Sequence, residues 1–243
     1  MDEIRFRNGT NDDFVAIDDL KRERTIKMRI DRKTSRLWNA LMAIVILAAM
    51  ISLSVVFVLN FRPLYDMDMR LLDIPGTSGY PAEEIKANYD ALIDYNSMFY
   101  TGTLEFPTLP QSEEAAMHFA EVKNIFVVFQ VSAIATTILS VASLLYYRRK
   151  HPRRSLRYAG YMGLALPVVL GIGIALNWNR MFVLFHQVLF RNDYWLFDPA
   201  TDPIILMLPD AYFMHCAIAI LGLVMLGSVL CLLVGKRVIW RNR

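Results

Sequence analysis

Two histidines lie in segments whose neighbouring residues could confine or tune an imidazole. His186 lies in an aromatic stretch, residues 177–210, with the letters FHQ at its centre. His118 begins the sequence HFAEVK, in which Glu121 would share one face of a helix with the histidine. An imidazole can both accept and donate a proton near neutral pH. The two residues are therefore candidates for general acid–base catalysis, with Glu121 orienting the His118 ring or raising its basicity.

Each segment also fits a plainer interpretation. Residues 177–210 could form an aromatic belt at a membrane surface that contains one incidental histidine. Glu121 and Lys123 could be polar residues at the end of a membrane span, with the lysine amine extended toward water. His151 lies in a short basic loop, where we expect a solvated side chain. His215 lies about one turn into an apolar run, where we expect a packed or hydrogen-bonded histidine rather than a catalyst.

Four apolar runs place these segments at a membrane. Each contains about 20 residues, the length of helix that crosses a hydrocarbon core, and hydrophobic residues make up 55% of the 243-residue chain. Helices satisfy their backbone polar groups within each span. We therefore predict an all-α membrane protein whose four spans cover residues 37–60, 125–147, 158–178 and 212–235.

The basic residues are unevenly distributed along the chain. Of the 26 Lys and Arg residues, 10 precede residue 37, 6 lie in residues 148–157 and 4 follow residue 235. Because basic residues beside a span remain in the cytoplasm, both termini and the middle loop should lie inside the cell. The basic clusters then need no nucleic-acid partner. The expected regions are a cytoplasmic extension (1–36), a catalytic transmembrane domain (37–235) with outer loops at 61–124 and 179–211, and a cytoplasmic tail (236–243).

The first outer loop should form a helical cap over the bundle. Pro81 followed by two glutamates is typical of a helix start, and Tyr89 lies on the apolar face of that helix. A second start signal at Ser112 predicts a helix that continues through His118 into the second span. His118 should therefore lie at the outer mouth of the bundle.

The order of these features resembles the lipoprotein intramolecular transacylase (Lit) family of low-GC Gram-positive bacteria. The features are four spans with a long first outer loop, the sequence HFAEVK from His118, the sequence FHQVLFRNDYW from Phe185, and Asp-Pro and Leu-Pro pairs before the last span. The resemblance covers about residues 37–235, and residues 1–36 precede the usual family start. Leu189 stands where the family often has an aromatic residue, a departure that concerns the pocket wall rather than the chemistry.

The resemblance implies an enzyme that acts on a lipoprotein whose N-terminal cysteine carries a diacylglyceryl group. Such enzymes move the sn-2 acyl chain onto the α-amine of the same cysteine, which gives a lyso-form lipoprotein without a cofactor. His118 and His186 would be the catalytic pair, with His118 the favoured base because Glu121 lies near it. The supporting residues would be Glu121, Lys123, Asn88, Tyr89, Arg191, Asn192 and Trp195.

The implied site faces the extracellular leaflet of the plasma membrane, where an anchored lipoprotein holds its ester and its cysteine. The substrate supplies its own nucleophile, and neither cysteine of this chain is needed. Cys216 and Cys231 lie inside the last apolar run, about 22 Å apart at helical rise. They are too distant to form a disulfide with each other.

Two other classes of function remain open. A metal-dependent membrane hydrolase could gather His118, Glu121 and His186 with His215 or Asp198, although the sequence has no HExxH motif. A non-enzymatic accessory protein could bind lipoproteins without turnover. Against a transport function, the apolar runs carry no acidic or basic residue near their centres.

Overall fold

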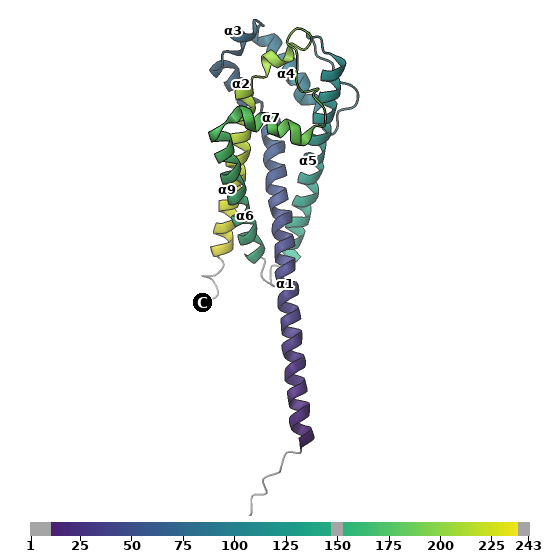
Figure 1. Ribbon diagram of the computed structural model, residues 1–243, viewed down its shortest axis with the longest axis vertical. Helices are drawn as coiled ribbons and strands as arrows, with labels where there is room; N and C mark the ends of the chain where they lie inside the picture. The colour runs from purple at the N-terminus through teal and green to yellow at the C-terminus, as the bar shows by residue number, and fades with distance from the viewer. Residues whose placement is uncertain (1–10, 147–152, 238–243) are drawn as a thin grey trace, which may run out of the picture.

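The computed structural model describes residues 11–146 and 153–237, and the regular structure within these residues is entirely helical. The helices are α1 (Asn11–Asn60), α2 (Arg62–Leu71), α3 (Ile74–Ser78), α4 (Ala82–Tyr95), α5 (Glu113–Tyr146), α6 (Arg153–Leu176), α7 (Trp178–Leu189), α8 (Ile204–Met207) and α9 (Asp210–Arg237). Figure 1 shows a bundle of long helices with a cap of shorter ones at one end.

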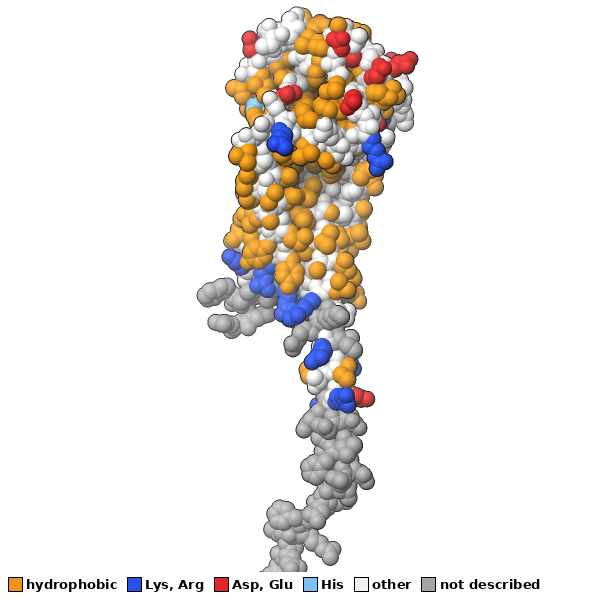
Figure 2. Space-filling view, in the orientation of Figure 1, with side chains coloured by type: hydrophobic (Ala, Val, Ile, Leu, Met, Phe, Trp, Pro, Cys, Tyr) orange, Lys and Arg blue, Asp and Glu red, His pale blue; other side chains and the backbone are white. Residues whose placement is uncertain are grey.

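Four helices are long and apolar enough to cross a membrane, which confirms the predicted all-α, four-span architecture. The candidate spans lie in Arg22–Asn60, Glu113–Tyr146, Arg154–Leu176 and Asp210–Lys236. α1 packs against α5, α6 and α9, and α6 packs along α9. Hydrophobic side chains cover the outside of the bundle in the view of Figure 2, as expected for a surface that contacts lipid.

Small and polar residues allow the spans to approach one another closely. A Cβ atom added to Gly160 on α6 would lie 2.7 Å from Leu232 Cγ and 2.9 Å from the Ser228 carbonyl oxygen, both on α9. Ser155 Oγ on α6 donates a hydrogen bond of 2.9 Å to Asn39 Oδ1 on α1, and both side chains are buried. Close backbone contact and hydrogen bonding between helices stabilise bundles that lipid surrounds.

α1 is much longer than a membrane requires. The helix continues without interruption through residue 36, where the expected cytoplasmic extension meets the first span. Residues 22–29 are exposed, and Figure 1 shows α1 extending alone beyond the bundle on the side away from the cap. The first ten residues lie outside the described part of the chain.

The cap has its own hydrophobic core, to which both outer loops contribute. Tyr65 on α2 stacks on Tyr89 on α4 with ring centroids 3.7 Å apart. The Tyr65 hydroxyl donates to the Met207 carbonyl oxygen of α8 at 2.7 Å, and the Tyr89 hydroxyl lies 2.9 Å from that of Tyr212 on α9. These three tyrosines and Met207 are almost fully buried, so the cap joins the two loops into one unit.

Local sequence explains most helix ends. α1 ends at Asn60 ahead of Pro63, and the predicted starts of α4 and α5 are confirmed. Residues 74–81, which are rich in Pro and Gly, contain the short helix α3. α3 begins after Asp73, whose φ is 46°, and ends at Gly79 with φ 79°. Its first turn is closed by Asp73 Oδ1, which accepts from the Gly76 amide.

Candidate active site

α7 carries His186 between the bundle and the cap (Figure 1). The helix begins where Asn177 Oδ1 accepts a hydrogen bond of 2.9 Å from the Arg180 amide, a typical N-cap. Near its other end, His186 Nδ1 lies 2.8 Å from the Phe182 carbonyl oxygen, one turn earlier. A carbonyl oxygen only accepts hydrogen bonds, so Nδ1 carries the proton. Nε2 of the neutral ring is therefore left with a free lone pair.

α5 brings His118 to the same place from the other side of the sequence. The helix start is fixed by Ser112, whose Oγ accepts from the Ala115 amide at 3.0 Å and whose own amide donates to Asp202 Oδ1 at 2.7 Å. His118 is only 6% exposed, two turns from this start. Its ring centroid lies 6.2 Å from that of His186, with 30° between the ring planes. The structure thus brings together the two histidines that the sequence singled out.

Aromatic rings enclose both imidazoles. Phe190 and Phe197 meet the His118 ring edge-on at centroid distances of 4.7 and 5.4 Å. Trp195 stacks on His186 at 4.6 Å, and Phe182 lies 4.3 Å from the same ring. The sequence analysis identified the aromatic stretch but did not identify Phe197 as a neighbour of His118. For the rings beside His186, the four-residue spacing of Phe182, His186 and Phe190 was the available signal, because it predicts one shared helix face.

The aromatic surroundings affect the protonation of His186. Burial lowers its pKa from the ordinary value of 6.5, and the hydrogen bond to the Phe182 carbonyl and the charge of Asp210 oppose this shift only in part. His186 is therefore neutral at physiological pH, the form in which Nε2 accepts a proton. The Nδ1 atom of His118 is buried and has no hydrogen-bond partner in the described part of the chain.

Glu121 does not interact with His118 in the way that the sequence suggested. Its Oε1 atom accepts a hydrogen bond of 2.9 Å from Asn192 Nδ2, while Oε2 is buried and lacks a partner among the described residues. Because His118 Nδ1 is also unpartnered, the expected carboxylate–imidazole contact at this atom is absent. The competing partner comes from the tertiary structure, because Asn192 lies 71 residues away in the sequence and its side-chain amide donates a hydrogen bond to the carboxylate.

The remaining sequence candidates lie in different surroundings. Trp195 stacks on His186, but its Nε1 atom is buried without a partner in the described residues. Asn88 and Tyr89 are fully buried in the cap, where Asn88 Nδ2 binds Thr108 Oγ1 at 2.7 Å and Tyr89 packs among tyrosines. Lys123 donates to the Tyr100 carbonyl oxygen at 3.0 Å and lies over two tyrosine rings. Arg191 is exposed.

The structure also reveals an acid–histidine pair that sequence reasoning missed. His215 Nδ1 lies 2.8 Å from Oδ1 and 2.9 Å from Oδ2 of Asp68. Asp68 is fully buried on α2, and His215 lies on α9. The expectation of a hydrogen-bonded His215 is confirmed, whereas its partner, 147 residues away, carries no local sequence signal.

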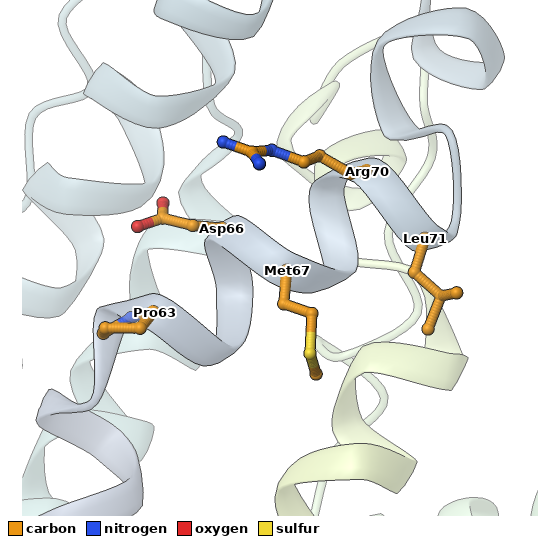
Figure 3. A pocket seen from close by; sticks show the side chains of 5 residues that line it. All are labelled: Pro63, Asp66, Met67, Arg70 and Leu71. Atoms are coloured by element: carbon orange, nitrogen blue, oxygen red, sulfur yellow. The ribbon is translucent and has the colours of Figure 1, made fainter.

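The residues that could bind a metal ion in a hydrolase do not gather at one site in the described part of the chain. Across residues 11–146 and 153–237, no three His, Cys, Asp or Glu side chains are placed to hold a metal ion. A shallow surface hollow lies instead along α2, lined by Pro63, Asp66, Met67, Arg70 and Leu71. In Figure 3, Met67 and Leu71 point away from the side on which Asp66 and Arg70 lie. This hollow belongs to a different element from the histidine pair.

Comparisons with known proteins place this geometry in a family. No curated protein matches the chain. Crystal structures of the membrane-integral lipoprotein intramolecular transacylase Lit from Bacillus cereus do match it. One has a TM-score of 0.84 at 38% identity and covers 87% of this chain and 98% of its own. Two further structures, in which one histidine is replaced by arginine or by alanine, have TM-scores of 0.81 and 0.80 at 36% and 37% identity. They cover 90% and 89% of this chain, and 98% and 99% of their own.

The family model gives the same result from sequence alone. The model described as "Lipoprotein intramolecular transacylase Lit" matches residues 40–213, which include most of the membrane-crossing part of α1, the second and third spans, and the aromatic rings around both histidines. The match begins after the part of α1 that extends beyond the bundle. This chain belongs to the lipoprotein intramolecular transacylase (Lit) family.

Proposed function

We propose that this protein transfers the sn-2 acyl chain of a diacylglyceryl-cysteine lipoprotein onto the α-amine of that cysteine. Family membership supports the reaction class. The observation that carries the residue assignment is the approach of His118 and His186, whose ring centroids lie 6.2 Å apart within a cluster of aromatic rings. The reaction is an aminolysis: a C–N bond forms, the C–O bond to glycerol breaks, and one proton moves from nitrogen to oxygen.

His186 is the better base of the pair. Its Nδ1 proton is held by the Phe182 carbonyl, so Nε2 can take the proton from the amine and return it to the departing glycerol oxygen. Nitrogen, oxyanion and leaving oxygen are all bonded to one carbon in the tetrahedral intermediate, so a single imidazole can reach both ends of the transfer. This assignment replaces the expectation that His118 is the base, because that expectation rested on a contact with Glu121 that the carboxylate does not make at Nδ1.

His118 is suited to stabilise the negative oxygen of the intermediate. A buried polar atom without a partner is uncommon and costs free energy, unless a ligand supplies the missing hydrogen bond. The Nδ1 atom of His118 is such an atom. With its proton on Nδ1, the neutral ring donates to the oxyanion, a type of contact that contributes about 3 kcal/mol to other acyl transfers. The rings of Phe190 and Phe197 restrict water, which would otherwise hydrolyse the ester.

One face of α7 is suited to contact with a lipid substrate. On α7, Leu184, Phe185 and Val188 are 49%, 56% and 73% exposed, so the helix that carries His186 also presents an apolar surface. An amphipathic helix of this kind lies at the boundary between head groups and acyl chains. The ester of an anchored lipoprotein occupies the same depth.

The protein is a multi-pass membrane protein, and its proposed orientation places the cap outside the cell. In Figure 2, Lys and Arg gather at the end of the bundle away from the cap, whereas Asp and Glu gather on the cap. Basic residues beside spans favour the cytoplasm. Both termini would then be cytoplasmic, and the histidine pair would face the outer leaflet of the plasma membrane.

The function is tested by the chemistry of lipoprotein N-termini in cells with and without this protein. Mass spectrometry of an N-terminal lipopeptide should show N-acyl, S-monoacylglyceryl cysteine only when the protein is present. The mass of the lipopeptide should be unchanged, because the transfer is an isomerisation, so fragmentation must locate the acyl chain on nitrogen. Diacylglyceryl-cysteine with a free amine in both strains would contradict the proposal, and loss of an acyl chain would indicate a hydrolase.

A further inference from the structure

The feature beside the histidine pair that the mechanism leaves unexplained is one oxygen atom of the Glu121 carboxylate. Glu121 Oε1 is bound by Asn192, and Asn192 is itself oriented because its Oδ1 accepts from the Tyr194 amide at 3.2 Å. Glu121 Oε2 is buried and unpartnered among the described residues. None of the ion pairs in that part of the chain includes Glu121. A half-satisfied carboxylate in such surroundings is costly to maintain unless a ligand completes it.

The position of Glu121 identifies the chemistry of the missing partner. The residue lies one turn after His118 on α5, so the two side chains start about 5–6 Å apart on one helix face. The free oxygen can only accept hydrogen bonds, and its charge favours a cationic donor. An ammonium or amine group therefore fits this place better than a hydroxyl, an ester oxygen or a phosphate.

We propose that Glu121 Oε2 binds the α-amine of the substrate's N-terminal cysteine and holds it beside the histidine pair. The inference rests on the proposed transacylase function and adds the group that recognises the nucleophile. The free amine separates this substrate from ordinary membrane diacylglycerols, which carry the same esters. Glu121 thereby selects lipidated N-terminal cysteine over diacyl lipids that lack an amine.

The carboxylate also matches the charge that develops during the reaction. A bound ammonium first releases one proton to water, and the neutral amine then attacks the ester carbonyl, so that nitrogen becomes positive and oxygen becomes negative. Glu121 stabilises the positive nitrogen through one N–H bond while His186 Nε2 removes a second proton, which then leaves with the glycerol oxygen. Glu121 neither gains nor loses a proton, so it acts as a binding and positioning residue for the amine.

Two unreactive ligands test the proposal directly. Both are cysteine lipopeptides with ether-linked alkyl chains that cannot transfer, and one lacks the α-amine. At pH 6.5, where an α-amine is mostly protonated, the wild-type protein should bind the amine ligand about 10- to 100-fold more tightly than the desamino ligand, the range for a hydrogen bond to a charged group. The variant Glu121→Gln should reduce this preference to less than about threefold. A merely structural role would weaken both ligands equally.

Matched variants keep the result interpretable. Glu113→Gln removes the same charge from an exposed position on α5 and should keep the full preference. If Glu121→Gln does not fold, the variant Asn192→Ala is used in its place. This variant removes the hydrogen bond that orients the Glu121 carboxylate, so the protein should lose part of its preference for the amine ligand. A full preference in whichever of these two variants is measured, or the absence of a preference from the wild-type protein, would overturn the role of Glu121. Conversion of the ester substrate is measured separately, so a failure of the transacylase function remains distinguishable.

Discussion

At the scale of single residues, two imidazoles from different helices lie in one cluster of aromatic rings but have different hydrogen-bond environments. His186 has a fixed Nδ1 proton and a free Nε2 lone pair, whereas His118 has a buried Nδ1 without a partner among the described residues. In the proposed mechanism, this difference assigns the function of base to His186 and that of electrostatic stabiliser to His118.

The pH dependence of turnover should report the protonation of His186. Burial lowers its pKa below 6.5, and only the neutral ring accepts a proton. The turnover number of the purified protein should therefore rise with pH in two steps, one at the lowered pKa of His186 and one near pH 8, where the substrate amine loses its proton. The step below pH 6.5 is the one that reports His186. A turnover number that rises on acidification below pH 6.5 would contradict a neutral imidazole base.

The Asp68–His215 pair should contribute to stability rather than to turnover. Asp68 is fully buried, so His215→Leu leaves its carboxyl group without the imidazole. We expect a loss of about 3 kcal/mol in the free energy of unfolding, the range for breaking a buried pair. Denaturant titration in mild detergent measures this loss. The double variant Asp68→Leu/His215→Leu should regain part of it, and a double variant less stable than His215→Leu would argue against the explanation.

At the scale of elements, the sequence predicted the helices that depend on hydrophobic periodicity and on the length of apolar runs. The four spans, the start of α4 at Pro81 and the continuation of α5 through His118 follow from apolar runs and local start signals. α7 was not predicted as a helix, although Asn177 provides its N-cap, because the aromatic stretch looked like an irregular belt.

The errors within the site have a common physical cause. Helical spacing correctly put His118 and Glu121 on one helix, but spacing does not reveal a competing partner from another segment. Asn192 and Asp68 reach their partners across 71 and 147 residues. Contacts of this range depend on how the cap closes over the bundle, which no local pattern encodes.

The α6–α9 seam gives a prediction at the same scale. Gly160→Ala would place a methyl group within 3 Å of the Leu232 side chain and the Ser228 backbone. We expect a loss of about 1–3 kcal/mol, the cost of overpacking. Gly171→Ala on the same helix is the control, because nothing lies within 4 Å of its added Cβ, and its stability should be unchanged or slightly higher. Equal unfolding midpoints for the two variants would show that the seam is not tightly packed.

At the scale of the whole molecule, cap and bundle divide the work. The bundle fixes the protein in the membrane, and the cap core, built around Tyr65 and Tyr89, holds both outer loops together. The histidine pair lies where these two parts meet, because α5 belongs to both and α7 crosses between them (Figure 1). In the proposed function, this position brings a lipid ester and a peptide amine to one site.

The proposed orientation predicts which side of the membrane each end of the molecule occupies. Cysteine introduced at the exposed cap residue Glu113 should react with a membrane-impermeant maleimide in intact cells. Cysteine introduced at Lys27, exposed on the far end of α1, should react only after lysis. Both variants are best made with Cys216 and Cys231 replaced by alanine. The reverse pattern would place the histidine pair at the inner leaflet.

The central claim is that His118 and His186 act as one unit on a single ester, and the rates of the two single variants and the double variant test it most directly. Purified protein is incubated with a lipopeptide that carries an isotope-labelled sn-2 chain, and mass spectrometry follows the label onto nitrogen. Each single alanine variant should be slower by about 10²- to 10⁴-fold, and the double variant should be no more than a few-fold slower still, because groups that act together are not additive. Label transfer at the wild-type rate by either single variant would contradict the account.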